Sequence, residues 1–251
     1  MKKLMLVVLG LGSLTVLFSQ QKTMRGIICF TEVSKLELKI EGDASQFSYA
    51  LPNEIKSEKE LLFNEEAALY RKHEKEESVS DMVAGEDQSV RIVVNEPDNI
   101  LFTDLTKGTT VEQKEFMTRM FLIDGKVNER SWKLTGNQQE ILGFPCQEAT
   151  TEEDSVQISA WFTPAIPVSA GPGGFGGLPG MILLVDADHG QRIIRAEKVE
   201  FRDISAADLQ KPKKGKALTK EEFRAMVDEK MKEMGASGGG GSHMMTIQIK
   251  Q

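Results

Sequence analysis

A stretch rich in glycine and proline constrains this chain more than any other part of its sequence. Six of the ten residues 171–180 are glycine, and Pro167, Pro172 and Pro179 flank or interrupt them. Glycine permits backbone angles and close approaches that a Cβ forbids, whereas each proline fixes its own φ and restricts the residue before it. The aliphatic run that follows, 181–185, is typical of a buried strand. The pattern therefore predicts a shaped loop leading into a core strand.

The first nineteen residues are typical of a secretory signal peptide. Lys2 and Lys3 precede an apolar segment from Leu4 to Phe18, about fifteen residues long, which is short for a bilayer span. Cleavage is expected after Ser19. No later run reaches the length of a membrane helix, so we expect an exported protein in the periplasm, at the cell surface or secreted. It should have no membrane span once the signal peptide is removed.

Charge and length limit what the exported chain can be. Without Lys2 and Lys3 it has 31 − 2 = 29 basic residues against 38 acidic ones, a net charge of −9. This charge opposes binding to nucleic acid. The length suits one hydrophobic core, so we expect a single β-rich domain over 20–235 and a Gly-rich flexible tail over 236–251. Residues 241–244, Gly-Ser-His-Met, also match a common cloning scar, which leaves open whether the whole tail is native.

Two-fold alternation of apolar and polar residues predicts a mainly β, antiparallel protein. We expect strands at 26–30, 35–41, 46–51, 58–72, 90–94, 100–105, 116–123, 131–134, 147–150, 156–162, 181–185 and 193–201. Asp124-Gly125 is expected to form a tight turn, 186–190 a hairpin turn, and Glu197-Lys198 a β-bulge. Residues 73–88 are aperiodic and mainly acidic, which favours a solvated loop over a partner or metal site.

Only the C-terminal part has the pattern of a helix. Thr219 and Glu222 form a capping box at its start, and Gly235 is expected to end it. The helix should carry one apolar stripe, made of Phe223, Met226, Val227, Met231 and Met234. A mainly β sheet with a C-terminal helix is therefore expected, with α+β as the alternative.

Two short motifs imitate ligand sites without their structural context. Gly171-x-Gly173-x-x-Gly176 matches the dinucleotide pattern, but prolines precede it and a strand follows where a helix is needed. Asp186-x-Asp188 resembles the start of a calcium loop, but it lies between strands and its glycine is displaced. We therefore expect neither a nucleotide nor calcium, and no cofactor.

The histidines, cysteines and methionines leave weaker possibilities open. His73, His189 and His243 have no ligand or triad partner at a helical or hairpin spacing. Cys29 and Cys146 are equally compatible with a disulfide and with two buried thiols. The soft donors near the C-terminus are candidate Cu(I) ligands, although the first two also belong to the helix stripe, and that apolar role is favoured. These donors are Met231, Met234, His243, Met244 and Met245.

Several short motifs, taken together, resemble the GLPGLI family of exported Bacteroidota proteins. They are Ile141-Leu-Gly-Phe144-x-Cys146-Gln-Glu-Ala149, Ala160-Trp-Phe-Thr163, Ile166-Pro167, Gly171-Pro172 and Gly177-Leu-Pro-Gly-Met-Ile182. The namesake motif reads GLPGMI here, with Met181 where the family name has leucine. The resemblance covers about residues 130–205. It implies a curved antiparallel sheet, or half-barrel, and supplies no catalytic residues.

These observations favour a non-catalytic exported binding protein, with an envelope protein or an apolar ligand as its partner. Its expected binding residues are those of the motif loop, for which a structural role is at least as well supported: Pro167, Gly171, Pro172, Gly177, Leu178, Pro179 and Gly180. The alternative is a copper-binding accessory protein that uses the tail. A third hypothesis, an enzyme, would depend on Ser169 or Asp186 acting without an evident partner.

Overall fold

The computed structural model describes residues 24–35, 54–73, 79–84, 88–93, 99–127, 130–153 and 155–237. Its strands are β1 (Gly26–Lys35), β2 (Glu54–Phe63), β3 (Ala67–Lys72), β4 (Val79–Ala84), β5 (Gln88–Val93), β6 (Ile100–Asp104), β7 (Thr109–Phe116), β8 (Arg119–Lys126), β9 (Lys133–Ile141), β10 (Phe144–Glu153), β11 (Val156–Thr163), β12 (Met181–Ala187), β13 (Arg192–Phe201) and β14 (Lys216–Thr219). A short 3-10 turn, η1 (Pro172–Gly174), and one helix, α1 (Lys220–Ser237), complete the described elements.

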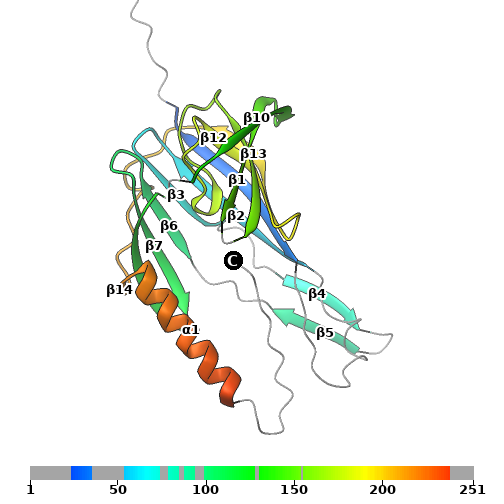
Figure 1. Cartoon of the computed structure of the whole chain (residues 1–251). Coiled ribbons are helices and arrows are strands. Elements are labelled where there is room, and N and C mark those ends of the chain that lie inside the picture. The colour runs from blue at the N-terminus through cyan, green and yellow to red at the C-terminus, as the bar shows by residue number, and fades with distance from the viewer. Residues whose placement is uncertain are drawn as a thin grey trace, which may run out of the picture.

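Twelve strands form one curved, open sheet in the order β14-β8-β7-β6-β3-β2-β1-β13-β12-β11-β10-β9 (Figure 1). Two runs of neighbouring antiparallel strands meet where β1 pairs with β13. One run is β1-β2-β3-β6-β7-β8, and the other is β13-β12-β11-β10-β9. Only β14 is parallel to its neighbour, β8. The predicted mainly β fold, a curved sheet with a C-terminal helix, is confirmed.

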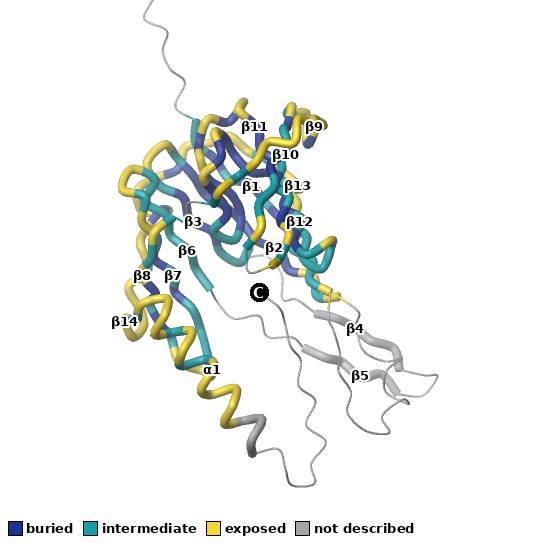
Figure 2. The backbone as a smooth tube through the Cα atoms, in the orientation of Figure 1, coloured by how far each residue is buried: buried dark blue, intermediate teal, exposed yellow. Residues whose placement is uncertain are grey.

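The main core lies on the inner face of the β1 and β10–β13 part of the sheet. Alternation places Ile28 and Phe30 of β1 on this face, next to Leu61 of β2, and all three are buried. The same cluster takes in Phe162 of β11 and Ile194 of β13. Figure 2 shows this buried region, with exposed backbone along β9 and most of α1. Burial of alternate residues explains the two-fold sequence pattern.

A smaller cluster covers the outer face of β2 and β3. Leu62 and Leu69 pack there against Ile204 and Leu209, which follow β13 in a non-regular segment. These strands are therefore buried on both faces, which is why β2 ends in a continuous apolar run instead of an alternation.

Helix α1 docks at the β8–β14 end of the sheet. Thr219 and Glu222 exchange the two hydrogen bonds of a capping box, at 2.8 and 3.1 Å, as predicted. The Phe223 ring meets the rings of Phe116 and Phe121 edge to face, with centroids 6.2 and 5.5 Å apart. Met231 is exposed, so among the stripe side chains that the structure describes, burial is confined to those nearer the start of the helix. The helix also continues to Ser237, two residues past the predicted end at Gly235.

Several boundaries differ from the sequence prediction. The strand expected at 116–123 is two strands, because Met117 and Thr118 form a turn with positive φ between β7 and β8. Asp124 and Gly125 lie inside β8 and do not form a turn. Part of the expected acidic loop, 79–84, is β4, which pairs only with β5 in a separate two-stranded sheet.

Other expectations are confirmed or fall outside the described residues. The hairpin turn joins β12 and β13 as predicted, and Glu197 is the extra residue of a bulge, because Cys29 pairs with Lys198 and Phe30 with Ala196. The proposed signal peptide and the strands expected within 36–53 lie outside the described residues. Among the residues described, no helix is both long and apolar enough to cross a membrane.

Candidate functional site

The motif loop, residues 164–180, packs against the inner face of the sheet. Its side chains Ile166, Val168, Phe175 and Leu178 are buried in the main core. The loop also runs back along β12, where Met181 N donates to Ile166 O at 3.0 Å and Ile182 N to Ala170 O at 2.9 Å. Of the seven predicted binding residues, Gly171, Pro172, Leu178 and Gly180 are buried, whereas Pro167, Gly177 and Pro179 are exposed. The loop therefore fills the inner face.

Two glycines in this loop are required by close backbone packing. A Cβ on Gly180 would lie 2.2 Å from the carbonyl oxygen of Thr163, and the φ of Gly180 is +154°. A Cβ on Gly171 would lie 2.8 Å from both the Cβ of Ile182 and the carbonyl oxygen of Phe175. A side chain has no room at either position, so the glycines make the loop compact.

Arg130 and Trp132 hold the loop from the side. An Arg130 guanidinium nitrogen donates to Gly174 O at 3.2 Å, and Trp132 Nε1 donates to Gly176 O at 2.9 Å. The same guanidinium lies 4.7 Å from the centre of the Phe175 ring. Sequence reasoning missed both residues, because a lone Arg and Trp ahead of a strand show no spacing that relates them to a loop more than forty residues away.

The motifs that imitate ligand sites have structural roles. The glycines of the dinucleotide-like pattern lead into β12 and not into a helix. Asp186 Oδ1 accepts a hydrogen bond from Gly190 N at 2.6 Å, which closes the turn between β12 and β13. Ser169 lies on the exposed side of the motif loop. Within the described part of the chain, no three His, Cys, Asp or Glu side chains are grouped to hold a metal ion.

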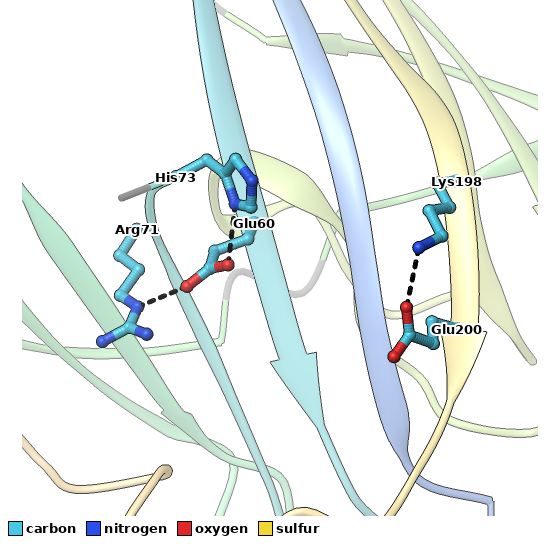
Figure 3. Close-up of polar contacts among 5 residues, drawn as sticks. All are labelled: Glu60, Arg71, His73, Lys198 and Glu200. Carbon is cyan, nitrogen blue, oxygen red and sulfur yellow. Dashed lines mark hydrogen bonds and ion pairs between the residues drawn. The ribbon is translucent and has the colours of Figure 1, made fainter. Parts of the chain in front are cut away.

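A row of polar side chains crosses the outer face of β3, β2, β1 and β13 (Figure 3). Glu60 is its buried centre: Arg71 Nε donates to Oε1 at 2.7 Å, and His73 Nδ1 lies 2.9 Å from Oε2. On the far side of β1, Lys198 Nζ lies 2.7 Å from Glu200 Oε2. The contacts of Glu60 keep a buried carboxylate hydrogen-bonded, which its burial requires.

Cys29 lies in this row between Glu60 and Lys198. Burial raises the pKa of the Cys29 thiol, and the Glu60 carboxylate raises that pKa further. A catalytic cysteine needs a lowered pKa, because the thiolate is the nucleophile. The row thus brings Cys, His and Glu onto one face without activating the thiol.

The two cysteines are free in the structure, so the disulfide considered from sequence is not formed. Cys29 is on β1 and Cys146 on β10, with three strands between them. Four strand spacings of about 4.8 Å far exceed the separation of about 7 Å that a disulfide allows between Cα atoms. Cys146 is buried in the core, and burial raises its pKa to about 11. The alternative of packed thiols describes Cys146 well.

An apolar surface cluster lies where β10 begins and β13 ends, and we call it the apolar tip. It consists of the ring pair Phe144 and Phe201, together with the exposed Leu142 in the turn that leads into β10. The rings of Phe144 and Phe201 meet edge to face at 6.3 Å, and Phe201 is 44% exposed. Leu142 is 45% exposed and has a φ of +52° in the turn between β9 and β10. A leucine in this left-handed conformation is strained, because its Cβ crowds the backbone.

The candidate copper ligands are only partly described. Met231 is on α1 and exposed, so its thioether is not taken up by the core. The side chain of Met234, and His243, Met244 and Met245, lie outside the described residues. The copper hypothesis therefore stays a prediction.

Comparison with known proteins adds a family model and a fold. A family model described as "Protein of unknown function (Porph_ging)" matches residues 109–184, from β7 through the motif loop into β12. A comparison with curated proteins finds no match.

Two solved structures share the fold. "Structure of PNGF-II in P21 space group" has a TM-score of 0.53 and 14% identity, over 82% of this chain and 34% of that one. "Structure of PNGF-II in C2 space group" has a TM-score of 0.53 and 13% identity, over 82% and 33%. The chain thus spans about a third of the length of these PNGF-II chains. At this identity the likeness shows the fold alone.

Proposed function

We propose that this protein is a non-catalytic exported binding protein that docks a partner protein on its surface. The alternative ligand, an apolar molecule held on the inner face, is less well supported, because the motif loop places its own apolar side chains there. Ile166, Val168, Phe175 and Leu178 occupy the position that an enclosed ligand would take. Binding proteins of that kind keep a concave, largely apolar site for their ligand.

The apolar tip is the observation that best supports docking of a partner protein. Exposed apolar clusters on soluble proteins commonly mark interaction sites, and aromatic side chains dominate the energetics of such sites. Leu142 adds an exposed apolar side chain in the turn that leads into Phe144. Gly or Asn would fit the positive φ of this turn better, but neither would place an apolar side chain there.

Export and family membership are part of the same proposal. The charged and apolar pattern of residues 1–19 supports a signal peptide. The match of the Porph_ging model to 109–184 overlaps the motifs that resemble the GLPGLI family. We propose that the chain is an exported member of the GLPGLI family.

Crosslinking from the apolar tip tests the docking proposal. We expect a photoreactive amino acid at position 142 to trap one discrete partner protein when the full chain is expressed in its own cell envelope. Met117 is the matched control, because it is also 45% exposed and also has a positive φ in a two-residue hairpin turn. A photoreactive residue at position 117 should not trap that partner.

A charge at the tip should then weaken the complex. Leu142→Asp is expected to reduce recovery of the partner about tenfold or more, because it places a carboxylate in an apolar contact. Met117→Asp should leave recovery unchanged. Identical crosslinked products from positions 142 and 117, or none from either, would contradict docking at the tip.

A further inference from the structure

The outer face of β10–β13 carries a row of side chains that the apolar tip does not use. Strand register places Glu148 opposite Trp161, Trp161 opposite Leu184, and Leu184 opposite Arg195. We call these four residues the tryptophan row. Neighbouring strands lie about 4.8 Å apart, so the row is about 14 Å long. It presents an aromatic ring between a carboxylate on one side and a guanidinium on the other.

Trp161 differs from the other tryptophan of the chain in how its indole N–H is used. Trp132 donates its N–H to the motif loop, at Gly176 O. Trp161 is half-buried against the core, and within the described ranges its N–H has no hydrogen-bond partner. Buried tryptophan N–H groups usually find an acceptor. Strand register places Trp161 on the outer face, where its partly exposed ring offers an apolar surface and its N–H is a donor that no described residue uses.

Glu148 is held in place beside this ring by three neutral donors. Thr135 Oγ1 and Asn137 Nδ2 donate to Oε2 at 2.8 and 2.7 Å, and Ser159 Oγ donates to Oε1 at 2.6 Å. The hydrogen bond from Ser159, followed by those from Asn137 and Thr135, lowers the pKa of Glu148, so the carboxylate is ionised at neutral pH.

A bulge in β9 makes this arrangement possible. Gln138 pairs with Gln147 and Leu134 with Ala149. Three residues of β9, 135–137, therefore lie opposite the single residue Glu148 of β10. Gly136, with a φ of +85°, turns the bulge so that Thr135 and Asn137 reach the same carboxylate oxygen. Bulges re-aim side chains in this way, often beside functional sites. An ionised carboxylate accepts at about four positions, so Glu148 keeps acceptor capacity for a ligand.

We propose that the tryptophan row binds a neutral carbohydrate chain. A sugar ring has a C–H face that can lie on the flat indole, and hydroxyls at its edge that match the ends of the row. One hydroxyl would donate to Glu148 and another would accept from Arg195, as charge-assisted hydrogen bonds. The row carries one negative and one positive charge, so it favours a neutral ligand over a phosphate backbone or a cationic peptide. This proposal goes beyond the proposed function, because it needs neither the apolar tip nor a partner protein.

Titration with defined oligosaccharides tests the proposal. The probes are the hexamers of β-1,4-glucose, α-1,4-glucose, β-1,3-glucose, β-1,4-mannose and β-1,4-N-acetylglucosamine. Binding to the full chain is measured by tryptophan fluorescence and by calorimetry. We expect at least one to bind saturably and to shift the tryptophan emission. Trp161→Ala should weaken its affinity about tenfold or more, and Trp161→Phe less, because phenylalanine keeps an aromatic face.

Glu148→Gln has a matched control on the same face of the same strand. Glu152 lies four residues further along β10 and is exposed. Glu148→Gln should weaken sugar binding about tenfold, through loss of a charged acceptor, whereas Glu152→Gln should not change it. If Trp161→Ala does not fold, the Phe and Gln variants still decide the question.

Three results would overturn the proposal. The first is that none of the five hexamers binds at millimolar concentration. The second is that the Trp161 and Glu148 variants bind a hexamer as well as Glu152→Gln does. Salt-sensitive binding of an oligolysine peptide in place of the sugars would assign the row to a cationic peptide instead. None of these results would affect crosslinking from Leu142, so failure here can be distinguished from failure of the partner proposal.

Discussion

Replacing Gly180 by valine should remove most of the folding stability of this protein. A Cβ at this position would lie 2.2 Å from the carbonyl oxygen of Thr163, and valine tolerates a φ of +154° poorly. The backbone would have to move where the motif loop joins β12, a strand whose residues are mostly buried. We expect a loss of more than about 4 kcal/mol in the free energy of unfolding, measured by urea denaturation.

Gly176→Ala is the control for this substitution within the same loop. A Cβ on Gly176 would meet its nearest neighbour, the carbonyl oxygen of Ser169, at 3.6 Å, an ordinary contact, and Gly176 has no positive φ. This variant should stay within about 0.5 kcal/mol of the wild type. A melting temperature of Gly180→Val within a degree or two of the wild type would contradict the structural role of the loop.

Phe175→Ala should have the second largest effect. The Phe175 ring is buried in the main core and lies under the Arg130 guanidinium. Removing it leaves a cavity between the motif loop and the sheet, and we expect a loss of about 3–5 kcal/mol in the free energy of unfolding. The measurement is urea denaturation with circular dichroism as the readout.

Phe201→Ala is the control for Phe175→Ala, because it also removes a phenyl ring but from an exposed position. Phe201 is exposed at the apolar tip, so its removal should cost less than about 1 kcal/mol. Equal destabilisation by the two substitutions would mean that the loop is not anchored through Phe175.

The sequence predicted the elements whose two faces differ, because their alternation is visible along the chain. β1, β11 and β13 bury alternate residues: β11 and β13 were predicted to within one residue at each end, and the first half of β1 was predicted as 26–30. The turn at Met117-Thr118 was missed, because neither residue is a usual choice for positive φ. The loop was expected from its glycines and prolines, but nothing local showed that it would fold back over the inner face and fill it.

The candidate sites depend on contacts between segments far apart in the sequence, which no local pattern shows. The apolar tip joins the start of β10 to the end of β13, more than fifty residues later. The tryptophan row needs the register of four strands, and its carboxylate is positioned by a bulge in β9. A one-residue change of register would move Trp161 to the other face, so a pattern alone could not place it.

Titration of the full chain with a fluorescent fatty acid tests the central claim most directly. That claim is that the protein's own motif loop occupies the inner face of the sheet and that ligands meet the outer surface. The account predicts no saturable change in fluorescence up to the solubility limit of the fatty acid, and the same result for Leu142→Asp. Saturable one-to-one binding that unlabelled fatty acid displaces, and that persists in Leu142→Asp, would show an apolar site inside the sheet and contradict the account.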